Sequence, residues 1–307
     1  MAELHVHLRH EVAAFDFRVS DVAPLSPILD IVWHDATESF IAGLVTADYV
    51  ATWDFESDWY DQSPRLKGVF TPAAGFDWVA HDPRGLVSVH HGTFHGPLMA
   101  ESLIGAILFV NRRIPAVLAN EAARGWDRDF QASGSMLRNQ RAVIVGYGSI
   151  GRDCARLLRA FGMTTYGVQR SVAHGSDEVG AILVRPDELP RVLGEAEHVI
   201  CLLPGIPDTD GYFTPELFSS CRGAHFYNFG RGNVVSESVL TSALDAGHLT
   251  SAVLDVTEPE PLPATSALWA DPRVLVMPHS SAIYQEYRPL YIEELSCLLP
   301  RLIAGTS

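Results

Sequence analysis

The chain has 307 residues, of which 47% are apolar, and this is enough for about two domains with ordinary hydrophobic cores. Its 22 Lys and Arg residues against 37 Asp and Glu residues give a formal charge of −15, which would repel the phosphates of nucleic acids and anionic lipids. The longest apolar run, Leu103–Val110, is far shorter than the ~20 residues that a membrane-spanning helix needs. We therefore expect a globular protein with neither a nucleic-acid nor a membrane partner.

The N-terminal residues, MAELHVHLRHEVAAFDF, mix charged and apolar side chains and lack the continuous apolar segment of a secretion signal. No pair of cysteines has CxxC spacing, and this usage suits a reducing compartment and structural thiols. We expect a cytoplasmic protein. The four cysteines are Cys154, Cys201, Cys221 and Cys297.

Short apolar stretches separated by polar segments in residues 1–97 predict alternating strands and helices. They include Ile28–Trp33, Tyr49–Trp53 and Lys67–Thr71. The segment from Pro97 to Asn120 is apolar on more than one face and predicts a long helix interrupted near Pro115. Such a helix could connect two domains or form a dimer contact, and we expect a homodimer.

The clearest unit begins at Ala142, where AVIV predicts a buried strand that leads into a glycine-rich turn and a helix over Ser149–Phe161. The turn, Gly146-Tyr-Gly148-Ser149-Ile150-Gly151, fits GxGxxG. In this motif the first glycine makes a tight turn, the second lets the backbone approach a pyrophosphate and the third lets the helix pack on the strand. The motif alone is weak, but the order of strand, turn and helix favours a dinucleotide site at the helix N-terminus.

Further buried strands are predicted downstream, with helix-compatible stretches between several of them, and this alternation indicates an α/β fold with a parallel sheet. A last helix is expected over Tyr284–Ala304, where it could pack on the N-terminal region. The predicted strands are Thr165–Val168, His198–Leu203, His225–Phe229, Ser251–Asp255 and Val274–Met277.

The residues after the second of these strands bear on the choice of cofactor. A carboxylate there would hold the ribose 2′-hydroxyl of NAD, but this sequence has Gln169, Arg170 and Ser171. The Arg170 guanidinium can pair with a 2′-phosphate and the Ser171 hydroxyl can donate to it, so we expect NADPH (NADP) to be preferred, with NAD possible. The alternatives are an exposed loop arginine and, for the glycine turn, another adenosine-containing ligand.

Six segments, taken in order, resemble the D-isomer-specific 2-hydroxyacid dehydrogenase family, and most closely its glyoxylate and hydroxypyruvate reductases. The resemblance runs from about residue 66 to residue 282. It implies a flavodoxin-like substrate domain, residues 1–97 with 280–307, and a Rossmann domain, residues 98–279. The segments are LKGVFTPAAGFD at 66–77, MAESLIG at 99–105, GYGSIG at 146–151, NFGRG at 228–232, LDVTEPEPLP at 254–263 and MPHSSA at 277–282.

The resemblance implies that Arg231 binds the substrate, and a guanidinium does match a planar 2-oxoacid. It also implies that His279 donates a proton to the substrate carbonyl and that Glu260 pairs with His279. Glu258, two residues earlier, is the alternative partner for the histidine. Each residue has an ordinary structural alternative when taken alone. Arg231, Asp255 and His279, however, each follow a predicted strand, and ligands of open α/β sheets bind at that edge.

Other contacts follow from the same resemblance. Asp255 would bind the nicotinamide carboxamide, and the loop containing Leu203, Pro204 and Thr209 would contact the cofactor. The backbone at Ala74 and Gly75 would hold the substrate carboxylate. The expected function is reduction of a small 2-keto acid, such as glyoxylate or hydroxypyruvate, to the D-2-hydroxy acid.

Two alternatives remain open at this point. One is a dehydrogenase that acts on a different 2-hydroxy acid or a small anion with NAD. The other is a non-enzymatic scaffold that senses dinucleotides, which the set of Arg231, Glu260 and His279 argues against. Histidine-rich segments near residues 5–10 and 90–95 have neither nearby cysteine nor an HExxH pattern, so no metal site is expected.

Overall fold

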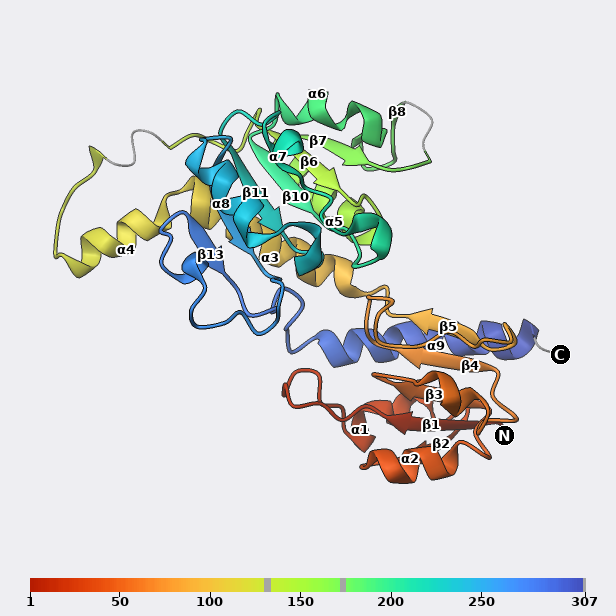
Figure 1. Ribbon diagram of the computed structural model, residues 1–307. Helices are drawn as coiled ribbons and strands as arrows, with labels where there is room; N and C mark the ends of the chain where they lie inside the picture. The colour runs from red at the N-terminus through yellow and green to blue at the C-terminus, as the bar shows by residue number, and fades with distance from the viewer. Residues whose placement is uncertain (130–133, 172–174, 306–307) are drawn as a thin grey trace. The chain divides into compact units, whose positions relative to one another are not determined.

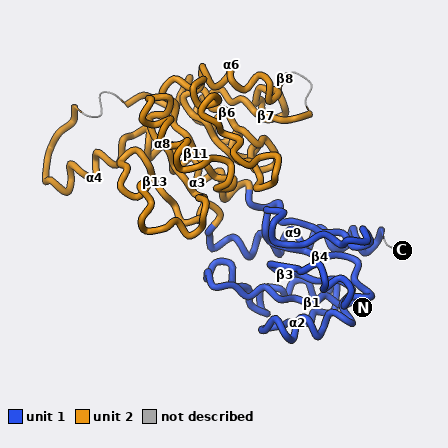
Figure 2. Tube along the Cα trace, in the orientation of Figure 1, with its two compact units in different colours: residues 1–95, 283–307 blue, residues 96–282 orange. Residues whose placement is uncertain are grey.

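The computed structural model describes residues 1–129, 134–171 and 175–305, and the chain divides into two compact units (Figure 2). Unit 1 comprises Met1–His95 and Ile283–Ser307, and unit 2 comprises Gly96–Ala282. The chain passes from unit 1 to unit 2 after His95 and returns to unit 1 after Ala282. These boundaries lie two and three residues from those predicted at 97 and 279. Assigning substrate binding to one unit and cofactor binding to the other remains a prediction.

Unit 1 contains a five-stranded parallel sheet of order β2-β1-β3-β4-β5. This order is that of flavodoxin-like folds. The strands are β1 (Glu3–His7), β2 (Asp30–Trp33), β3 (Tyr49–Thr52), β4 (Gly68–Thr71) and β5 (Ser88–His91), and the helices are α1 (Val19–Val22), α2 (Thr37–Gly43) and α9 (Tyr287–Gly305).

The C-terminal helix α9 returns to unit 1 and packs on α1, as predicted. Tyr287 and Tyr291 on α9 are buried, and the ring of Tyr287 stacks on Trp53 at the end of β3. Arg288 also pairs with Asp21 of α1 at 2.9 Å. The apolar face of α9 therefore completes the core of unit 1.

Unit 2 contains an eight-stranded sheet of order β13-β12-β11-β10-β6-β7-β9-β8, parallel except where β8 pairs with β9 (Figure 1). The predicted α/β class and Rossmann sheet are confirmed. The strands are β6 (Arg141–Val145), β7 (Thr164–Val168), β8 (Gly175–Ser176), β9 (Ile182–Val184), β10 (His198–Cys201), β11 (Ala224–Asn228), β12 (Leu249–Leu254) and β13 (Val274–Val276). The helices are α3 (His95–Asn111), α4 (Ile114–Ala122), α5 (Ser149–Ala160), α6 (Leu189–Leu193), α7 (Pro215–Phe218) and α8 (Glu237–Asp245).

The central strand β6 shows why an unbroken apolar run forms a strand here. Val143 and Val145 join a core cluster with residues of α6, α7 and α8 on one face of the sheet. Ala142 and Ile144 join a second cluster with residues of α3 and α5 on the other face. Because successive side chains of a strand point to opposite faces, a strand covered on both sides must be apolar throughout.

The predicted helix over 97–120 is two helices, α3 and α4, which are bent by 60° relative to each other. The break lies at Arg112 and Arg113, and the backbone of Arg113 has a φ of 52°. Pro115 occupies the first turn of α4, a position that suits a residue without an N–H donor. The proline therefore starts the second helix rather than kinking one long helix.

Within the described residues, no single helix is long and apolar enough to cross a membrane, although α3 and α4 meet the length and composition criteria as a bent pair.

Candidate active site

The glycine turn after β6 has the geometry of a phosphate cradle. Gly146 has a φ of +93°, and a Cβ there would lie 2.6 Å from the carbonyl carbon of Leu202. A Cβ on Gly148 would meet no atom within 4 Å, so the backbone at Gly148 faces open space directly before α5 begins at Ser149. A backbone open to approach at a helix N-terminus fits a pyrophosphate, as predicted for a dinucleotide.

The turn rests on a buried tyrosine. The hydroxyl of Tyr147 donates to the Asp177 carboxylate at 2.6 Å, and a Cβ on Gly151 would lie 3.1 Å from the Tyr147 ring. The Gln169 side-chain amide donates to the Tyr147 carbonyl oxygen. Gln169, which we expected among the cofactor contacts, thus holds the glycine turn in place.

Arg170 and Ser171 follow β7 at the same edge of the sheet. Arg170 is 79% exposed, and its guanidinium Nη1 lies 3.6 Å from the carboxylate of Asp208, which belongs to the loop after β10. Asp208 is not among the residues predicted from the sequence.

His279 and Glu260 form the central pair of the site. The Nδ1 atom of His279 and Oε2 of Glu260 lie 2.9 Å apart. The other carboxylate oxygen of Glu260 accepts a hydrogen bond of 3.0 Å from the Thr257 N–H. Glu260, and not Glu258, is therefore the glutamate that contacts the histidine.

The backbone at His279 has a φ of 49°, a left-handed conformation that non-glycine residues adopt uncommonly. The buried carboxylate of Asp255 accepts hydrogen bonds from the N–H groups of Ser280 and Ser281, and its carbonyl oxygen accepts one from the His279 N–H. In this structure Asp255 anchors the histidine turn, and its expected contact with the nicotinamide remains a prediction.

A further anchor comes from α3, where the Ser102 hydroxyl donates to the Ser281 carbonyl oxygen at 2.8 Å. Sequence reasoning missed this residue. Ser102 lies in the MAESLIG segment, but nothing in the segment indicates which distant backbone group its hydroxyl meets.

Arg231 lies beyond the end of β11, beside the strand that precedes Asp255. Its Nη1 donates to the Gly230 carbonyl oxygen at 3.0 Å, and its own carbonyl oxygen accepts from the Asn228 amide at 2.9 Å. Arg231 acts electrostatically on both Glu260 and His279. The structure thus brings the three predicted catalytic residues together in unit 2.

The pKa values in this group follow from its charges. The hydrogen bond that His279 donates to the Glu260 carboxylate raises the pKa of His279, against burial and the Arg231 charge, which lower it. Burial raises the pKa of Glu260, but the hydrogen bonds from His279 and the Thr257 N–H, with the charges of His279 and Arg231, outweigh it and leave the pKa lowered. The pair therefore favours an imidazolium beside a carboxylate, which suits a proton donor.

The remaining predicted residues lie in two places. In the loop after β10, the buried Thr209 hydroxyl donates to the carbonyl oxygens of Pro204 and Ile206, which fixes the shape of the loop. Leu203 packs closely on Gly230, where a Cβ would lie 2.4 Å from the Leu203 carbonyl oxygen. Ala74 and Gly75 belong to unit 1 and not to unit 2.

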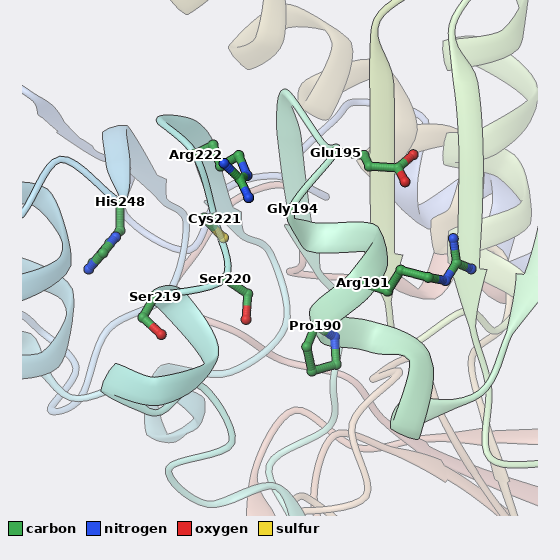
Figure 3. Close-up of a pocket in the computed structure, with 9 residues that line it drawn as sticks. All are labelled: Pro190, Arg191, Gly194, Glu195, Ser219, Ser220, Cys221, Arg222 and His248. Carbon is green, nitrogen blue, oxygen red and sulfur yellow. The ribbon is translucent and has the colours of Figure 1, made fainter.

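A hollow elsewhere in unit 2 does not form a second site of this kind. Its lining comes from α6 and from the segments before β11 and β12, so it lies at the edge where those strands begin. Figure 3 shows Arg191 and Glu195 extending away from Arg222 and His248, so the charged groups do not converge. Among the described residues there is also no cluster of three or more His, Cys, Asp or Glu side chains able to hold a metal ion.

The cysteines take no part in this geometry. All four are free thiols, and only Cys297 is exposed. Burial raises the pKa of Cys154, Cys201 and Cys221 to about 12 each, which keeps these thiols protonated and inert.

A doubly wound sheet with a phosphate cradle, and with an arginine and a histidine–glutamate pair at the same edge, defines a dinucleotide-dependent oxidoreductase. Residues 104–281 match the family described as D-isomer specific 2-hydroxyacid dehydrogenase, NAD binding domain. The chain belongs to this family of NAD(P)-dependent enzymes, and the resemblance seen in its motifs is confirmed.

Individual relatives agree with this placement. A protein of Escherichia fergusonii named glyoxylate/hydroxypyruvate reductase B is 32% identical over 253 residues, which are 80% of this chain and 76% of that protein. A D-isomer specific 2-hydroxyacid dehydrogenase from Xanthobacter autotrophicus, solved with NADPH and MES, superimposes with a TM-score of 0.83 at 28% identity, covering 99% of this chain and 95% of the other. The NADPH-dependent glyoxylate/hydroxypyruvate reductase of Sinorhizobium meliloti, solved with NADP and sulfate, gives a TM-score of 0.82 at 28% identity, covering 99% and 96%.

Proposed function

We propose that this protein reduces a small 2-keto acid of the glyoxylate and hydroxypyruvate type to the D-2-hydroxy acid, with NADPH as the preferred cofactor. The observation that carries the proposal is the 2.9 Å hydrogen bond between His279 and Glu260, within electrostatic reach of Arg231. The relatives named for glyoxylate and hydroxypyruvate reduction support the choice of substrate.

In the proposed mechanism, the Arg231 guanidinium binds the carboxylate and carbonyl of the substrate through its planar fork of donors. His279 donates a proton to the carbonyl oxygen, and its Nε2 is the available donor because Nδ1 is engaged by Glu260. Glu260 keeps the imidazole protonated and oriented. The bound nicotinamide supplies the hydride.

The proposed cofactor site uses the glycine turn and the residues after β7. The open backbone at Gly148, at the start of α5, would hold the pyrophosphate. Arg170 and Ser171 would receive the 2′-phosphate of NADPH, since no carboxylate follows β7 in the sequence Gln169-Arg170-Ser171.

The experiment that tests the proposal is steady-state reduction of glyoxylate, hydroxypyruvate, pyruvate and larger 2-oxoacids with NADPH and with NADH, followed at the nicotinamide absorbance. The expected result is the highest kcat/KM with a two- or three-carbon 2-keto acid and NADPH. Preference for a bulky 2-oxoacid would overturn the substrate assignment, and preference for NADH would overturn the cofactor assignment. Configuration is read from the chiral products of hydroxypyruvate and pyruvate with a D-specific enzymatic assay, since the product of glyoxylate has no stereocentre.

We further propose that unit 1 carries the substrate-carboxylate loop at Ala74 and Gly75, that unit 2 binds the cofactor, and that the protein works as a cytoplasmic homodimer. The small side chains at residues 73–75 support the first point, because they leave backbone N–H groups accessible. The exposed apolar surface of α4 supports the dimer.

A further inference from the structure

Arg170 and Asp208 come from different loops but meet at the carboxyl edge of the sheet in unit 2. β10 and β7 lie on either side of β6, so the loops that follow them flank the glycine turn. Arg170 follows β7 and Asp208 lies in the loop after β10, and their charged groups are 3.6 Å apart. Both side chains are about three-quarters exposed, at 79% and 76%, so neither is held away from an incoming ligand.

The position of Asp208 matters because the sequence has no carboxylate directly after β7. In dinucleotide sites a carboxylate at the end of the second strand accepts a hydrogen bond from the ribose 2′-hydroxyl of NAD, and here that position has Gln169 followed by Arg170. The Gln169 amide is already engaged by the Tyr147 carbonyl oxygen. A carboxylate that reaches Arg170 also reaches the region where Arg170 would meet the 2′ substituent.

We infer that Asp208 is a specificity-determining residue that supplies this carboxylate from the loop after β10. It accepts a hydrogen bond from the 2′-hydroxyl when NAD(H) is bound and repels the 2′-phosphate of NADP(H), whereas Arg170 attracts that phosphate. The two residues act in opposite directions, and together they make the enzyme able to use both cofactors. The inference rests on the proposed function, since it assumes that the adenosine ribose lies at this edge.

The test compares Asp208→Asn with wild type by titrating NADP⁺ and NAD⁺ into the protein in a calorimeter, which requires no turnover. For an exposed charge in water, we expect NADP⁺ to bind about threefold to tenfold more tightly and NAD⁺ to bind more weakly by about threefold in the variant. The gain for NADP⁺ should shrink at high salt, because exposed charges are screened. The kcat/KM ratio for NADPH over NADH should rise in parallel.

The matched control is Asp245→Asn. Asp245 is also exposed and paired with an arginine, Arg273 at 2.8 Å, but both precede strands and so lie at the opposite edge of the sheet. This control removes the same charge and should leave both affinities unchanged. Equal effects of the two substitutions would overturn the inference, because they would show a general charge effect. So would an Asp208→Asn protein that binds NAD⁺ and NADP⁺ as wild type does.

A third variant separates this inference from the proposed function. Arg170→Ala should weaken NADP⁺ binding and leave NAD⁺ binding nearly unchanged. If Arg170→Ala behaves in this way while Asp208→Asn has no effect, the inference fails and the proposed NADPH site stands. If Arg170→Ala leaves NADP⁺ binding unchanged, the proposed site for the 2′-phosphate fails and the inference fails with it.

Discussion

The Nδ1 atom of His279 lies 2.9 Å from the Glu260 carboxylate, and this hydrogen bond orients the ring and is the largest influence on its pKa. The hydrogen bond raises the pKa of His279, and the Asp255 charge acts in the same direction. A protonated imidazole is therefore available at a higher pH than for a histidine without such a partner.

The first prediction concerns the pH dependence of the reaction. Reduction needs protonated His279, so kcat/KM for the keto acid should fall as pH rises through its pKa. Glu260→Gln removes the charge that raises this pKa, so the fall in kcat/KM should move to lower pH. The pH profiles of both proteins check this. A Gln variant whose profile has the same midpoint and a lower plateau would assign Glu260 a different role.

The second prediction concerns the proton donor itself. His279→Ala should lower kcat by about 10²-fold to 10⁴-fold, the usual contribution of general acid catalysis. Cofactor affinity should be retained, because the glycine turn follows β6 and the proposed 2′-phosphate site follows β7, whereas His279 follows β13. Steady-state kinetics and a cofactor titration measure the two quantities. Equal activity of the purified variant and wild type would refute the assignment.

The third prediction separates substrate capture from proton transfer. Arg231→Ala should raise KM for the keto acid, because the substrate carboxylate loses its planar cationic partner. It should also raise the pKa of His279, since the Arg231 charge lowers that pKa. The fall of activity with pH should therefore move to higher pH, opposite to the shift in Glu260→Gln. A variant with unchanged KM and an unchanged profile would contradict both roles.

The fourth prediction uses two glycines of the same turn. Gly148→Ala adds a Cβ in open space, so the melting temperature should stay near wild type while cofactor affinity drops, because the methyl occupies the pyrophosphate approach. Gly146→Ala puts a Cβ 2.6 Å from the Leu202 carbonyl carbon at a φ of +93°, and should lower the free energy of unfolding by about 1–3 kcal/mol. Thermal melts and cofactor titrations of both variants decide the matter. A Gly148→Ala protein with full affinity would place the pyrophosphate elsewhere.

Much of unit 2 could be predicted because its signals are local. The apolar run at 142–145, the glycine turn and the helix after it follow one another along the chain, and each depends on residues close in sequence. Unit 1 was harder. Strand β1, with His5 and His7, and strand β5, with His90 and His91, carry polar residues, so apolar patterning did not reveal them.

The parts of the site that escaped prediction depend on long-range contacts. The left-handed backbone of His279 is held by Asp255, and the Ser281 carbonyl by Ser102 on α3, which is 179 residues away in the chain. The spacing of residues in the sequence does not reveal such long-range contacts unless a family resemblance indicates them. The same holds for Asp208 beside Arg170, since two loops meet there only because their strands flank β6.

The last prediction concerns assembly, and its structural basis is α4. This helix has no buried residue, and in Figure 1 it extends away from the sheet of unit 2. Leu118 on α4 is 52% exposed, and Trp126 and Met136 beyond it are exposed as well. A groove with apolar lining residues, including Phe109, Val274 and Leu275, runs beside the base of α4. Apolar surface of this kind favours burial against a second copy of the chain.

Leu118→Glu should therefore convert a dimer of twice the 33.6 kDa chain mass into a monomer, as measured by light scattering after size exclusion. A carboxylate buried in an apolar interface without a partner costs several kcal/mol, which is enough to dissociate a dimer at micromolar concentration. Leu86→Glu is the control, because Leu86 lies in unit 1 and is 76% exposed. It should leave the mass unchanged. A monomeric wild type would remove the dimer proposal, and a Leu118→Glu dimer would move the interface away from α4.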